Sequence, residues 1–409
     1  MPSADSYATV FRMSGVSINT DPQKINELLT RGVTEVIHEA DLRKKLESGV
    51  PLRVKLGIDP TSPNLHIGRA IPLLKLRDFQ ELGHQVVFIV GDFTSVIGDT
   101  SDKDSERPML THEAIEENKR TYLAQVSTLI DTERAEFRYN SEWLGPLGYN
   151  EIGEHADQFS VADFIARDNI KRRIDAGKRV SLREVLYPLM QGYDSVAVRA
   201  DVELGGTDQR FNLLAGRTLQ EHFGQEAQNI IIGPLINGLD GRKMSSSWGN
   251  TINLTATPED MYGKVMSMRD EDIVTYFTLC TRLPLSDVAE IEKTLTDGGN
   301  PRDAKMQLAR EIVSLYHGED TAHTAEEAFV ATFRDGGVPE DILEIACEGG
   351  ETYADALVRC GVVTSKSELT RLVTQGGVHD AVSGEKISEI PRDAGATLRI
   401  GKRRFIRLV

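Results

Sequence analysis

The sequence has few of the residues that would place a protein outside the cytoplasm. It contains three cysteines, Cys280, Cys347 and Cys360, without CxxC spacing, which fits a reducing compartment and favours neither disulfides nor a zinc site. No apolar run approaches the roughly 20 residues of a membrane-spanning helix, and the N-terminal stretch lacks the basic and apolar regions of a secretion signal. We expect a soluble, cytoplasmic protein with no membrane partner and no protein-bound structural metal.

Acidic residues outnumber basic ones, except near the C-terminus. The net charge is −16, yet residues 351–409 contain ten Lys and Arg against seven Asp and Glu. The electrostatic field near a surface follows the local charge, so a polyanion would approach this tail and be repelled elsewhere. The hydrophobic content of 40% and charged content of 27% are ordinary for a globular protein and exclude extended disorder.

The first 250 residues predict a doubly wound parallel sheet. "RVKLGI" (53–58) reads as a short strand, a helical periodicity then runs to Leu82 and ends at Gly83, and "HQVVFIVGDF" (84–93) is continuously apolar. Strand, helix and strand in this order form a βαβ unit, which places parallel strands between layers of helices. Further strands are expected within 201–217, where a helix follows a Gly-Gly turn, and at 227–236.

Four other regions complete the expected organisation. At 409 residues the chain exceeds the usual single-core limit, so several domains are expected. We predict a helix at 21–48, a mainly helical insertion at about 105–190 within a catalytic domain of residues 1–250, a helical domain at 251–345, and a small α+β domain at 346–409. The helical domain should contain helices near 258–268, 270–281, 300–317 and 321–333, and the last domain a helix within 365–378.

The stretch "DPTSPNLHIGRA" (59–70) lies where the first strand passes into the first helix. Ligands of doubly wound sheets bind beyond the carboxyl ends of the strands, and a helix N-terminus there favours an anion such as a triphosphate. Gly68 allows close approach, while His66 and Arg69 can donate hydrogen bonds to phosphate oxygens. Taken alone, His66 could merely cap the helix and Arg69 could be solvated.

A second basic stretch, "DGRKMSSSWGN" (240–250), follows the predicted strand at 227–236. Arg242 and Lys243 stand beside three serines and between glycines, which is typical of a mobile loop that can close on phosphates. Donors that tighten on a leaving pyrophosphate act in the transition state, where they accelerate the reaction most. Alone, this loop could be an ordinary surface turn, and its pairing with the first stretch makes the nucleotide interpretation specific.

A third motif, "SLREVLYPLMQGYDS" (181–195), predicts a helix with polar groups on one face. The S-x-x-E spacing at its start is a capping box. Tyr187, Gln191 and Asp194 follow at i, i+4 and i+7, so they share a face. A phenol, an amide and a carboxylate aligned in this way form a polar pocket wall, or alternatively a stripe that faces solvent.

Together these motifs resemble a known family. His66 to Arg69 and Lys243 to Ser247 are similar to the HIGH and KMSKS signatures of class I aminoacyl-tRNA synthetases, and "YPLMQGYD" and "GGTDQ" narrow the resemblance to the tyrosyl-tRNA synthetases of the bacterial type. The resemblance covers essentially the whole chain. It implies a Rossmann-like catalytic domain with a helical insertion, a helical anticodon-binding domain and an S4-like RNA-binding domain.

The resemblance also implies a reaction and its partners. We expect ATP and tyrosine to form tyrosyl-adenylate and pyrophosphate, and the tyrosyl group to pass to the 3′ end of tRNA(Tyr). Mg²⁺ would accompany the nucleotide, and a homodimer would form through the insertion. No protein nucleophile is required, so positioning and charge stabilisation would supply most of the acceleration.

The family pattern assigns roles to residues along the whole chain. Asp99, Tyr187 and Gln191 would hold the ammonium group of tyrosine, Asp194 its phenol, and Gln209 would lie near its carboxylate. The complete predicted set is His66, Arg69, Lys243 and Thr61 as catalytic residues; Asp59, Gly68, Gly206, Asp208, Arg242 and Ser246 for ATP; Asp99, Tyr187, Gln191, Asp194, Gln209, Lys55 and Gly57 for tyrosine; and Lys366, Arg371, Lys402, Arg403 and Arg404 for tRNA.

Three positions depart from the family pattern. Arg69 stands where a histidine is usual, Ser246 replaces the second lysine of the mobile loop, and Lys55 occupies the place of a phenol-binding tyrosine. Two alternatives therefore stay open at this point. One is a tryptophanyl synthetase or another nucleotidyltransferase with a HIGH-type loop, and the other is an RNA-binding protein whose adenylating site has decayed. The basic tail could also be a solvated edge, and Asp99 an ordinary turn residue.

Overall fold

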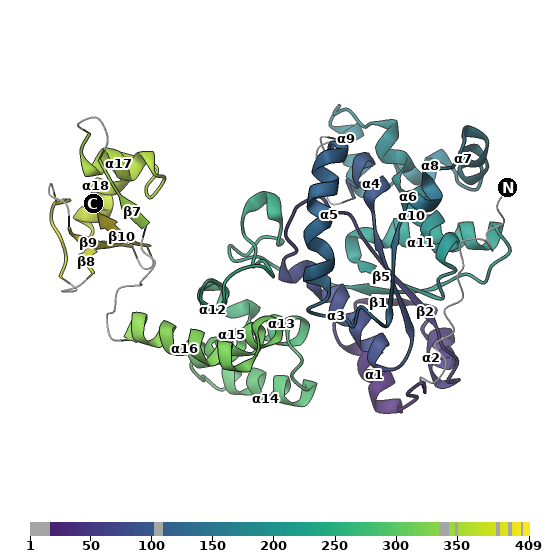
Figure 1. Cartoon of the computed structure of the whole chain (residues 1–409), viewed down its shortest axis with the longest axis horizontal. Helices are drawn as coiled ribbons and strands as arrows, with labels where there is room; N and C mark the ends of the chain where they lie inside the picture. Colours follow the sequence, from purple (N-terminus) through teal and green to yellow (C-terminus); the bar gives the residue numbers. More distant parts are fainter. Residues whose placement is uncertain are drawn as a thin grey trace. The chain divides into compact units, whose positions relative to one another are not determined.

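The computed structural model describes residues 17–101, 109–334, 343–347, 351–381, 385–391, 395–401 and 404–409. The chain divides into two compact units, residues 1–319 and 320–409 (Figure 1). The domain boundaries expected near 250 and 345 fall inside these units and stay predictions. In the described part of the chain, no helix is both long enough and apolar enough to cross a membrane.

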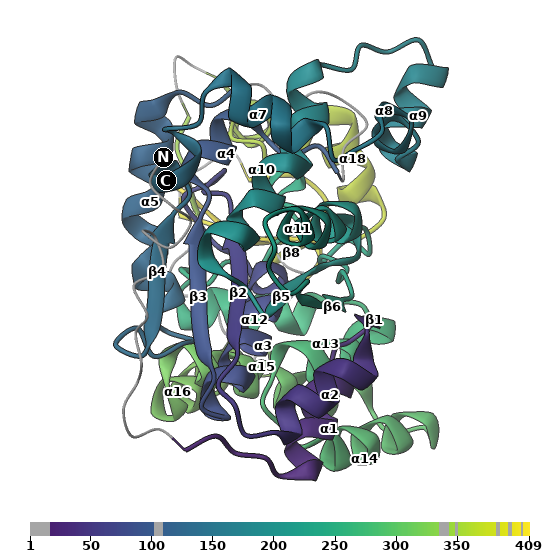
Figure 2. The same ribbon diagram turned by 90° about the vertical axis from the view of Figure 1, so that its right-hand side faces the viewer.

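The first unit is built on a six-stranded sheet with the order β1-β6-β5-β2-β3-β4, which Figure 2 shows from one side of the sheet to the other. The strands are β1 (Glu35–Ile37), β2 (Arg53–Ile58), β3 (Gln85–Val90), β4 (Ala135–Tyr139), β5 (Val202–Gly206) and β6 (Asn229–Gly233). All neighbours pair in parallel except β1, which is antiparallel to β6. The predicted α/β class with a doubly wound parallel sheet is confirmed, with one antiparallel edge strand added.

The βαβ unit that opens the sheet agrees with its prediction. Strand β2 leads through the 59–66 loop into α3 (Ile67–Glu81), which returns the chain to the start of the sheet. Strand β3 then pairs with β2 and runs in the same direction. Every residue of β3 is buried, which explains its continuous apolar sequence, and burying each such side chain contributes roughly 1.5–3 kcal/mol. Gly83 has φ +96, a left-handed conformation that ends the helix and that glycine adopts without strain.

The predicted helix at 21–48 is wrong. The segment forms α1 (Pro22–Thr30), the short strand β1 and α2 (Glu39–Glu47). Gly32, with φ +62, ends the first helix, and His38, with φ 61, precedes the second. Between them the β-branched residues of "VTEVI" favour an extended backbone, which pairs with the edge of β6.

The segment at 105–190 is mainly helical in its described part, from residue 109 onward, but it also contains β4. This strand was not predicted, because its half-buried sequence "AEFRY" lacks the continuous apolar run of a central strand. Helices that surround the sheet include α4 (Asp92–Ile97), α5 (His112–Val126), α6 (Ser141–Leu144), α7 (Tyr149–Ala156), α8 (Val161–Ile165), α9 (Asp168–Asp175), α10 (Leu182–Val198) and α11 (Arg210–His222), with 3₁₀ turns at Thr207–Gln209 and Ser246–Trp248.

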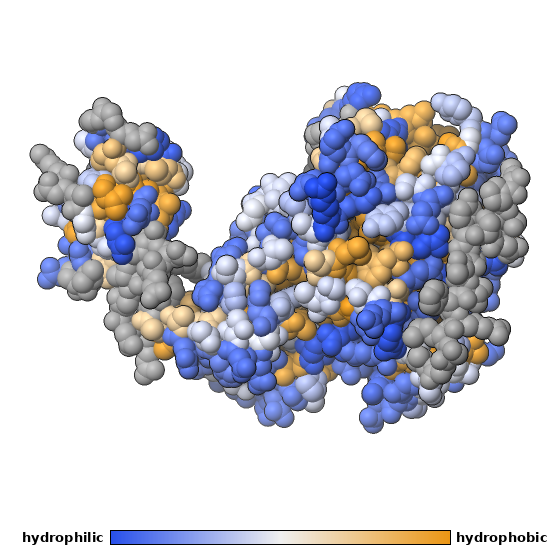
Figure 3. Space-filling view, viewed as in Figure 1, coloured by the Kyte–Doolittle hydropathy of each residue, from blue (hydrophilic) through white to orange (hydrophobic). Residues whose placement is uncertain are grey.

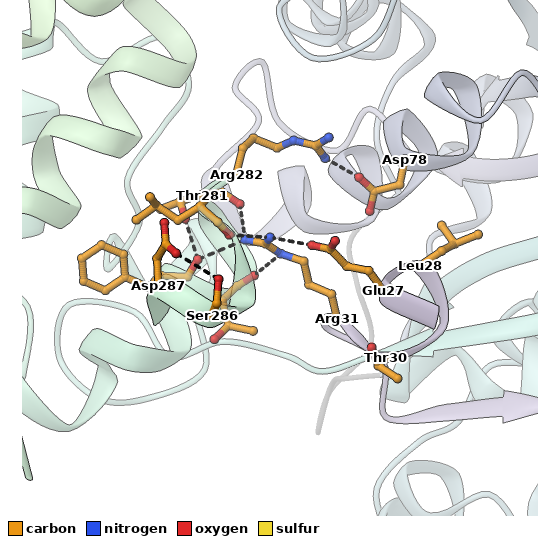
Figure 4. Close-up of polar contacts among 12 residues, drawn as sticks. Glu27, Leu28, Thr30, Arg31, Asp78, Thr281, Arg282, Ser286 and Asp287 are labelled. Atoms are coloured by element: carbon orange, nitrogen blue, oxygen red, sulfur yellow. Dashed lines mark hydrogen bonds and ion pairs between the residues drawn. The ribbon is translucent and has the colours of Figure 1, made fainter. Parts of the chain in front are cut away.

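The first unit ends in a group of helices attached to the sheet layer through two arginines. Its elements are α12 (Pro258–Ser267), a 3₁₀ turn at Asp270–Asp272, α13 (Ile273–Cys280), α14 (Leu285–Thr296), which was not predicted, and α15 (Pro301–His317). In Figure 4, Arg31 reaches the end of α13, where its guanidinium donates to the carbonyls of Thr278 at 3.0 Å and Thr281 at 2.8 Å. Arg282 pairs with Asp78 on α3. Since a helix end leaves carbonyls unsatisfied, Arg31 completes α13 and fixes it to α1.

The second unit contains α16 (Glu319–Arg334), apart from its first residue, and a small α+β fold. The latter comprises β7 (Leu343–Ile345), α17 (Tyr353–Arg359), α18 (Lys366–Thr374), β8 (Val378–Asp380), β9 (Thr397–Ile400) and β10 (Arg404–Leu408), with sheet order β7-β10-β9-β8. Apolar side chains of both helices and the sheet share one core. The predicted α+β character of this end is confirmed.

Candidate active site

A cavity of about 820 Å³ lies at the carboxyl ends of the parallel strands. Gly57 and Asp59 come from the end of β2, Gly91 follows β3, Asn140 follows β4, and Gly206 ends β5. Such an edge collects the loops of a doubly wound sheet. Of the residues predicted as catalytic or as contacts of ATP and tyrosine, the following line it: Gly57, Asp59, Thr61, His66, Gly68, Arg69, Asp99, Tyr187, Gln191, Asp194, Gly206, Asp208, Gln209, Lys243 and Ser246.

The first cationic stretch stands at the N-terminus of α3. His66 precedes the helix and is buried, and its Nδ1 has no hydrogen-bond partner among the described residues. Burial, reinforced by the charges of Arg69 and Lys243, lowers the pKa of His66 to about 3, so the imidazole is neutral at pH 7. The guanidinium of Arg69 donates to the hydroxyl of Thr61 at 3.1 Å. An unpartnered imidazole and a guanidinium therefore face one cavity.

The second cationic stretch meets the first across a short backbone pairing. The amide of Ile67 donates to the carbonyl of Ile252 at 2.9 Å, and the amide of Leu254 donates to Leu65 at 2.8 Å. His66 and Asn253 form an isolated antiparallel bridge. A side chain on Gly68 would lie 3.2 Å from the sulfur of Met244, so the two stretches adjoin at a glycine that leaves room for contact.

Two of the loop's charged groups are already paired. The ammonium of Lys243 lies 3.1 Å from the carboxylate of Asp208, which also lines the cavity. Arg242 instead pairs with Asp240 and stacks over the ring of Trp248, with 4.8 Å between guanidinium carbon and ring centroid. Lys243 therefore points into the cavity, and Arg242 is not among the residues that line it.

The other end of the cavity is formed by α10. The predicted common face is confirmed, because Tyr187, Gln191 and Asp194 all line the cavity. The hydroxyl of Tyr187 donates to Asp59 at 2.9 Å, and burial raises the pKa of Asp59 to about 6. The indole N–H of Trp143 donates to Asp194 at 2.8 Å, yet burial still raises the pKa of Asp194 to about 7. This part of the cavity therefore contains two carboxyl groups, Asp59 and Asp194, whose pKa values lie close to neutral pH.

Comparison with known proteins fits this geometry. The family model for class I tRNA synthetases (W and Y) matches residues 47–334. The tyrosine–tRNA ligase of Bordetella pertussis is 46% identical over 387 residues, which cover 92% of this chain and 94% of that protein. The tyrosine–tRNA ligase of Thermotoga maritima is 44% identical over 393 residues, with 95% and 98% covered. The chain belongs to the tyrosine–tRNA ligases of class I.

The family's fold is also that of this chain. The solved structure of a C-terminally truncated mitochondrial tyrosyl-tRNA synthetase from Aspergillus nidulans superposes with a TM-score of 0.64. It is 22% identical, and the match covers 76% of this chain and 94% of that one. Class I synthetases use ATP, whose negative charge suits the cations that line the cavity beside His66.

Lys55 differs from the other residues predicted for tyrosine. It is fully buried beneath the cavity, is not among the lining residues, and forms an ion pair with Glu203 at 2.9 Å. Its direct contact with tyrosine stays a prediction that this placement does not favour. The cause is register, since Lys55 lies directly opposite Glu203 on the neighbouring parallel strand.

Four polar residues at or beneath the cavity were not predicted: Asn140, Trp143, Glu203 and Asn212. Asn140 and Trp143 both donate to Asp194. They follow β4, so recognising that strand would have directed attention to them, as the carboxyl end of a parallel strand. Glu203 and Asn212 contact Gln191, and no local pattern marks them.

The predicted tRNA contacts lie in the second unit. Lys366 and Arg371 are exposed and line a shallow groove along α18. Arg404 is exposed and donates to the carbonyl of Val362. Lys402 and Arg403 lie outside the described residues. The roles of all five stay predictions.

Proposed function

We propose that the cavity carries out both steps of tyrosine charging. The carboxylate of tyrosine attacks the α-phosphorus of ATP, the bond to the β-phosphate bridging oxygen breaks, and tyrosyl-adenylate and pyrophosphate result. The tyrosyl group then passes to a hydroxyl at the 3′ end of tRNA(Tyr), releasing AMP. The observation that carries this proposal is the pairing of residues 65–67 with 252–254, which holds both cationic stretches at one cavity.

At the nucleotide end, the proposal assigns the phosphates to His66, Arg69 and Lys243. A neutral imidazole donates one hydrogen bond, and the two cations offset the charge that grows on the leaving pyrophosphate. Gly206 and Asp208 would meet the ribose. Because Lys243 is paired with Asp208 before ATP binds, the nucleotide must exchange this ion pair for contacts of its own. We expect Mg²⁺ to arrive with the phosphates.

At the amino-acid end, Asp194 would accept a hydrogen bond from the phenol of tyrosine. The ammonium group would meet Asp99, Tyr187 and Gln191, and the carboxylate would lie near Gln209, where it can reach the α-phosphorus. A site that hydrogen-bonds the phenol rejects phenylalanine, because its own polar groups would stay unpaired; this synthetase is the standard example of that principle. Asp194 is 4% exposed, so an unpaired state would be costly there.

For tRNA, the proposal uses the groove on α18. Lys366 and Arg371 stand five positions apart on α18, line the same groove and have exposed side chains. Contacts of this kind neutralise phosphates without reading sequence, so binding would weaken steeply with added salt. The rest of the chain carries an excess of acidic residues, so the negatively charged tRNA would approach preferentially at residues 351–409.

A homodimer through the 105–190 segment is the proposed assembly. Large apolar side chains are exposed on several of its helices, including Tyr149 at 95%, Val161 at 73% and Leu182 at 73%. Figure 3 shows apolar surface in the part of the view where Figure 1 places α8 and α10. Exposed large apolar side chains that lie together are typical of an interface.

The proposed location of the protein is the cytoplasm.

The deciding experiment is ATP–pyrophosphate exchange with a panel of amino acids. We expect exchange with tyrosine and little with tryptophan or phenylalanine. Exchange driven by tryptophan but not tyrosine would reject the substrate, and tRNA binding without any exchange would indicate that the adenylating site has decayed. Charging of tRNA(Tyr) in the same preparation tests the second step.

A further inference from the structure

A buried ion pair lies directly beneath the amino-acid end of the cavity. The ammonium of Lys55 on β2 is 2.9 Å from the carboxylate of Glu203 on β5, and the two side chains are 1% and 2% exposed. An ionised carboxylate only accepts hydrogen bonds. Every other polar group that meets Glu203 must therefore present a donor to it.

This requirement fixes the amide of Gln191. Its nitrogen lies 3.2 Å from the carboxylate of Glu203 and must be the donor. The amide oxygen then occupies the opposite end, 3.1 Å from the nitrogen of Asn212. A rotation of the Gln191 amide by half a turn would place oxygen against carboxylate and two NH₂ groups together. The carboxylate of Glu203 and the nitrogen of Asn212 therefore set the orientation of this amide.

Asn212 carries the same constraint to Gln209. Its side-chain nitrogen is also 3.0 Å from the oxygen of Gln209. The nitrogen of Gln209 must then face the other way, where it donates to the carboxylate of Asp99 at 2.7 Å. The hydrogen bonds thus form one series, Glu203–Gln191–Asn212–Gln209–Asp99, with a carboxylate that accepts at each end.

Asn212 contributes to this series through the two N–H groups of its side-chain amide and not through its oxygen. The side chain is 1% exposed, and its oxygen has no hydrogen-bond partner in the described part of the chain. Turning the amide would satisfy neither neighbour, because both present oxygen atoms to it. Asn212 is absent from the cavity lining, whereas Gln191 and Gln209 both line it. The nitrogen of Asn212 also lies 3.4 Å from the hydroxyl of Ser101, so its two shortest hydrogen bonds are those to the amides of Gln191 and Gln209.

We propose that Asn212 is a positioning residue for the amino-acid substrate. It holds Gln191 and Gln209 in the one orientation that the Lys55–Glu203 ion pair permits, so that tyrosine meets a fixed donor and a fixed acceptor at each amide. Lys55 acts through Glu203 in this arrangement and needs no contact with the phenol. The inference rests on the proposed contacts of Gln191 and Gln209 with tyrosine.

The test is Asn212→Leu in the full chain, which removes both N–H groups at similar volume and adds no charge. We expect KM for tyrosine in pyrophosphate exchange to rise at least about tenfold, because both amides lose the donor that fixes their orientation, while KM for ATP changes less than about threefold. The matched control is Asn229→Leu. Asn229 is equally buried but donates to Asp41, away from the cavity, so its loss should lower the melting temperature and leave KM for tyrosine unchanged.

A second variant keeps the test decisive if Asn212→Leu does not fold. Asn212→Ser retains one hydroxyl donor and should give a smaller rise in KM for tyrosine. No rise in either variant, equal rises for tyrosine and ATP, or the same rise in the Asn229 control would overturn the inference. Gln191→Ala separates the proposed site contacts from the positioning role of Asn212. If it leaves KM for tyrosine unchanged, the proposed site contacts fail; if it raises KM while the Asn212 variants do not, only the positioning role fails.

Discussion

Replacing Asp194 with alanine should weaken the binding of tyrosine far more than that of ATP. The carboxylate lies on the α10 side of the cavity, where it contacts Trp143 and Asn140. The two cationic stretches line the cavity near the N-terminus of α3. A hydrogen bond to a charged group contributes about 1.5–3 kcal/mol. At about 1.4 kcal/mol per tenfold, KM for tyrosine should rise about 10- to 150-fold. KM for ATP should change less than about threefold. The hydrogen bonds that Asp194 accepts within the described residues come from Asn140 and Trp143 and not from the two cationic stretches, so its loss leaves those stretches in place.

The same carboxylate gives this prediction a pH dependence. Burial raises the pKa of Asp194 to about 7, so a rising pH ionises it and improves its capacity to accept from the phenol. If the ionised form binds, tyrosine affinity should increase about tenfold between pH 6 and pH 8, following the ionised fraction of a group with this pKa. Asp59, with a pKa of about 6, also titrates nearby, so the increase must be compared with that of Asp194→Asn, which keeps Asp59.

The assay is pyrophosphate exchange with tyrosine and ATP varied in turn, on the wild type, Asp194→Ala and Asp194→Asn. Asp194→Asn is the near-isosteric control, and its tyrosine affinity should lose most of the pH dependence above pH 6. Equal losses for tyrosine and ATP in Asp194→Ala would refute the assignment of this end of the cavity. An unchanged pH profile in Asp194→Asn would show that another group titrates.

Three other predictions test the remaining parts of the site. Lys243→Ala should lower kcat for exchange about 100- to 1,000-fold, as removal of a preorganised donor to a developing anion does, whereas Arg242→Ala, whose side chain is held by Asp240 and Trp248, should change it less than about tenfold; the reverse order would exclude Lys243. Ser246→Lys, which restores the cation usual in the family, should raise kcat for exchange, and a decrease would show that the serine is adapted to this loop. Lys366→Glu with Arg371→Glu should impair tRNA charging at low salt and make its dependence on salt less steep, because fewer phosphates are neutralised, while sparing exchange; unimpaired charging at all salt concentrations would remove α18 from the tRNA surface.

The parts of the fold that the sequence predicted well are those whose signals are local. Strands β2 and β3 and helix α3 each carry a complete apolar pattern within a few residues, and the glycine after α3 marks its end. Strand β1 was missed, because its stability depends on pairing with β6 almost 200 residues away. Strand β4 was missed for a related reason: an edge strand is only half-buried, so its pattern is weak.

The same distinction applies to the cavity. The cationic stretches and the polar face of α10 are contiguous in sequence, and their residues were identified with a family pattern. Trp143 and Asn140 reach Asp194 over more than 50 positions, a contact that only the packed sheet creates. Lys55 shows the same limit, since its place in the family pattern led us to include it among the tyrosine contacts, whereas its pairing with Glu203 depends on strand register, which the sequence does not show.

The pairing of residues 65–67 with 252–254 means that the serine-rich loop is tethered at its exit to the start of α3. Glycines with left-handed backbones at 241 and 249 flank the basic segment, so a change of backbone conformation at these two positions would move the segment while the pairing after it stays in place. Shortening or lengthening the loop between these glycines would alter how far Lys243 can travel without displacing His66. A change in the length of this loop would therefore alter the reach of Lys243 while every side chain that lines the cavity stays the same.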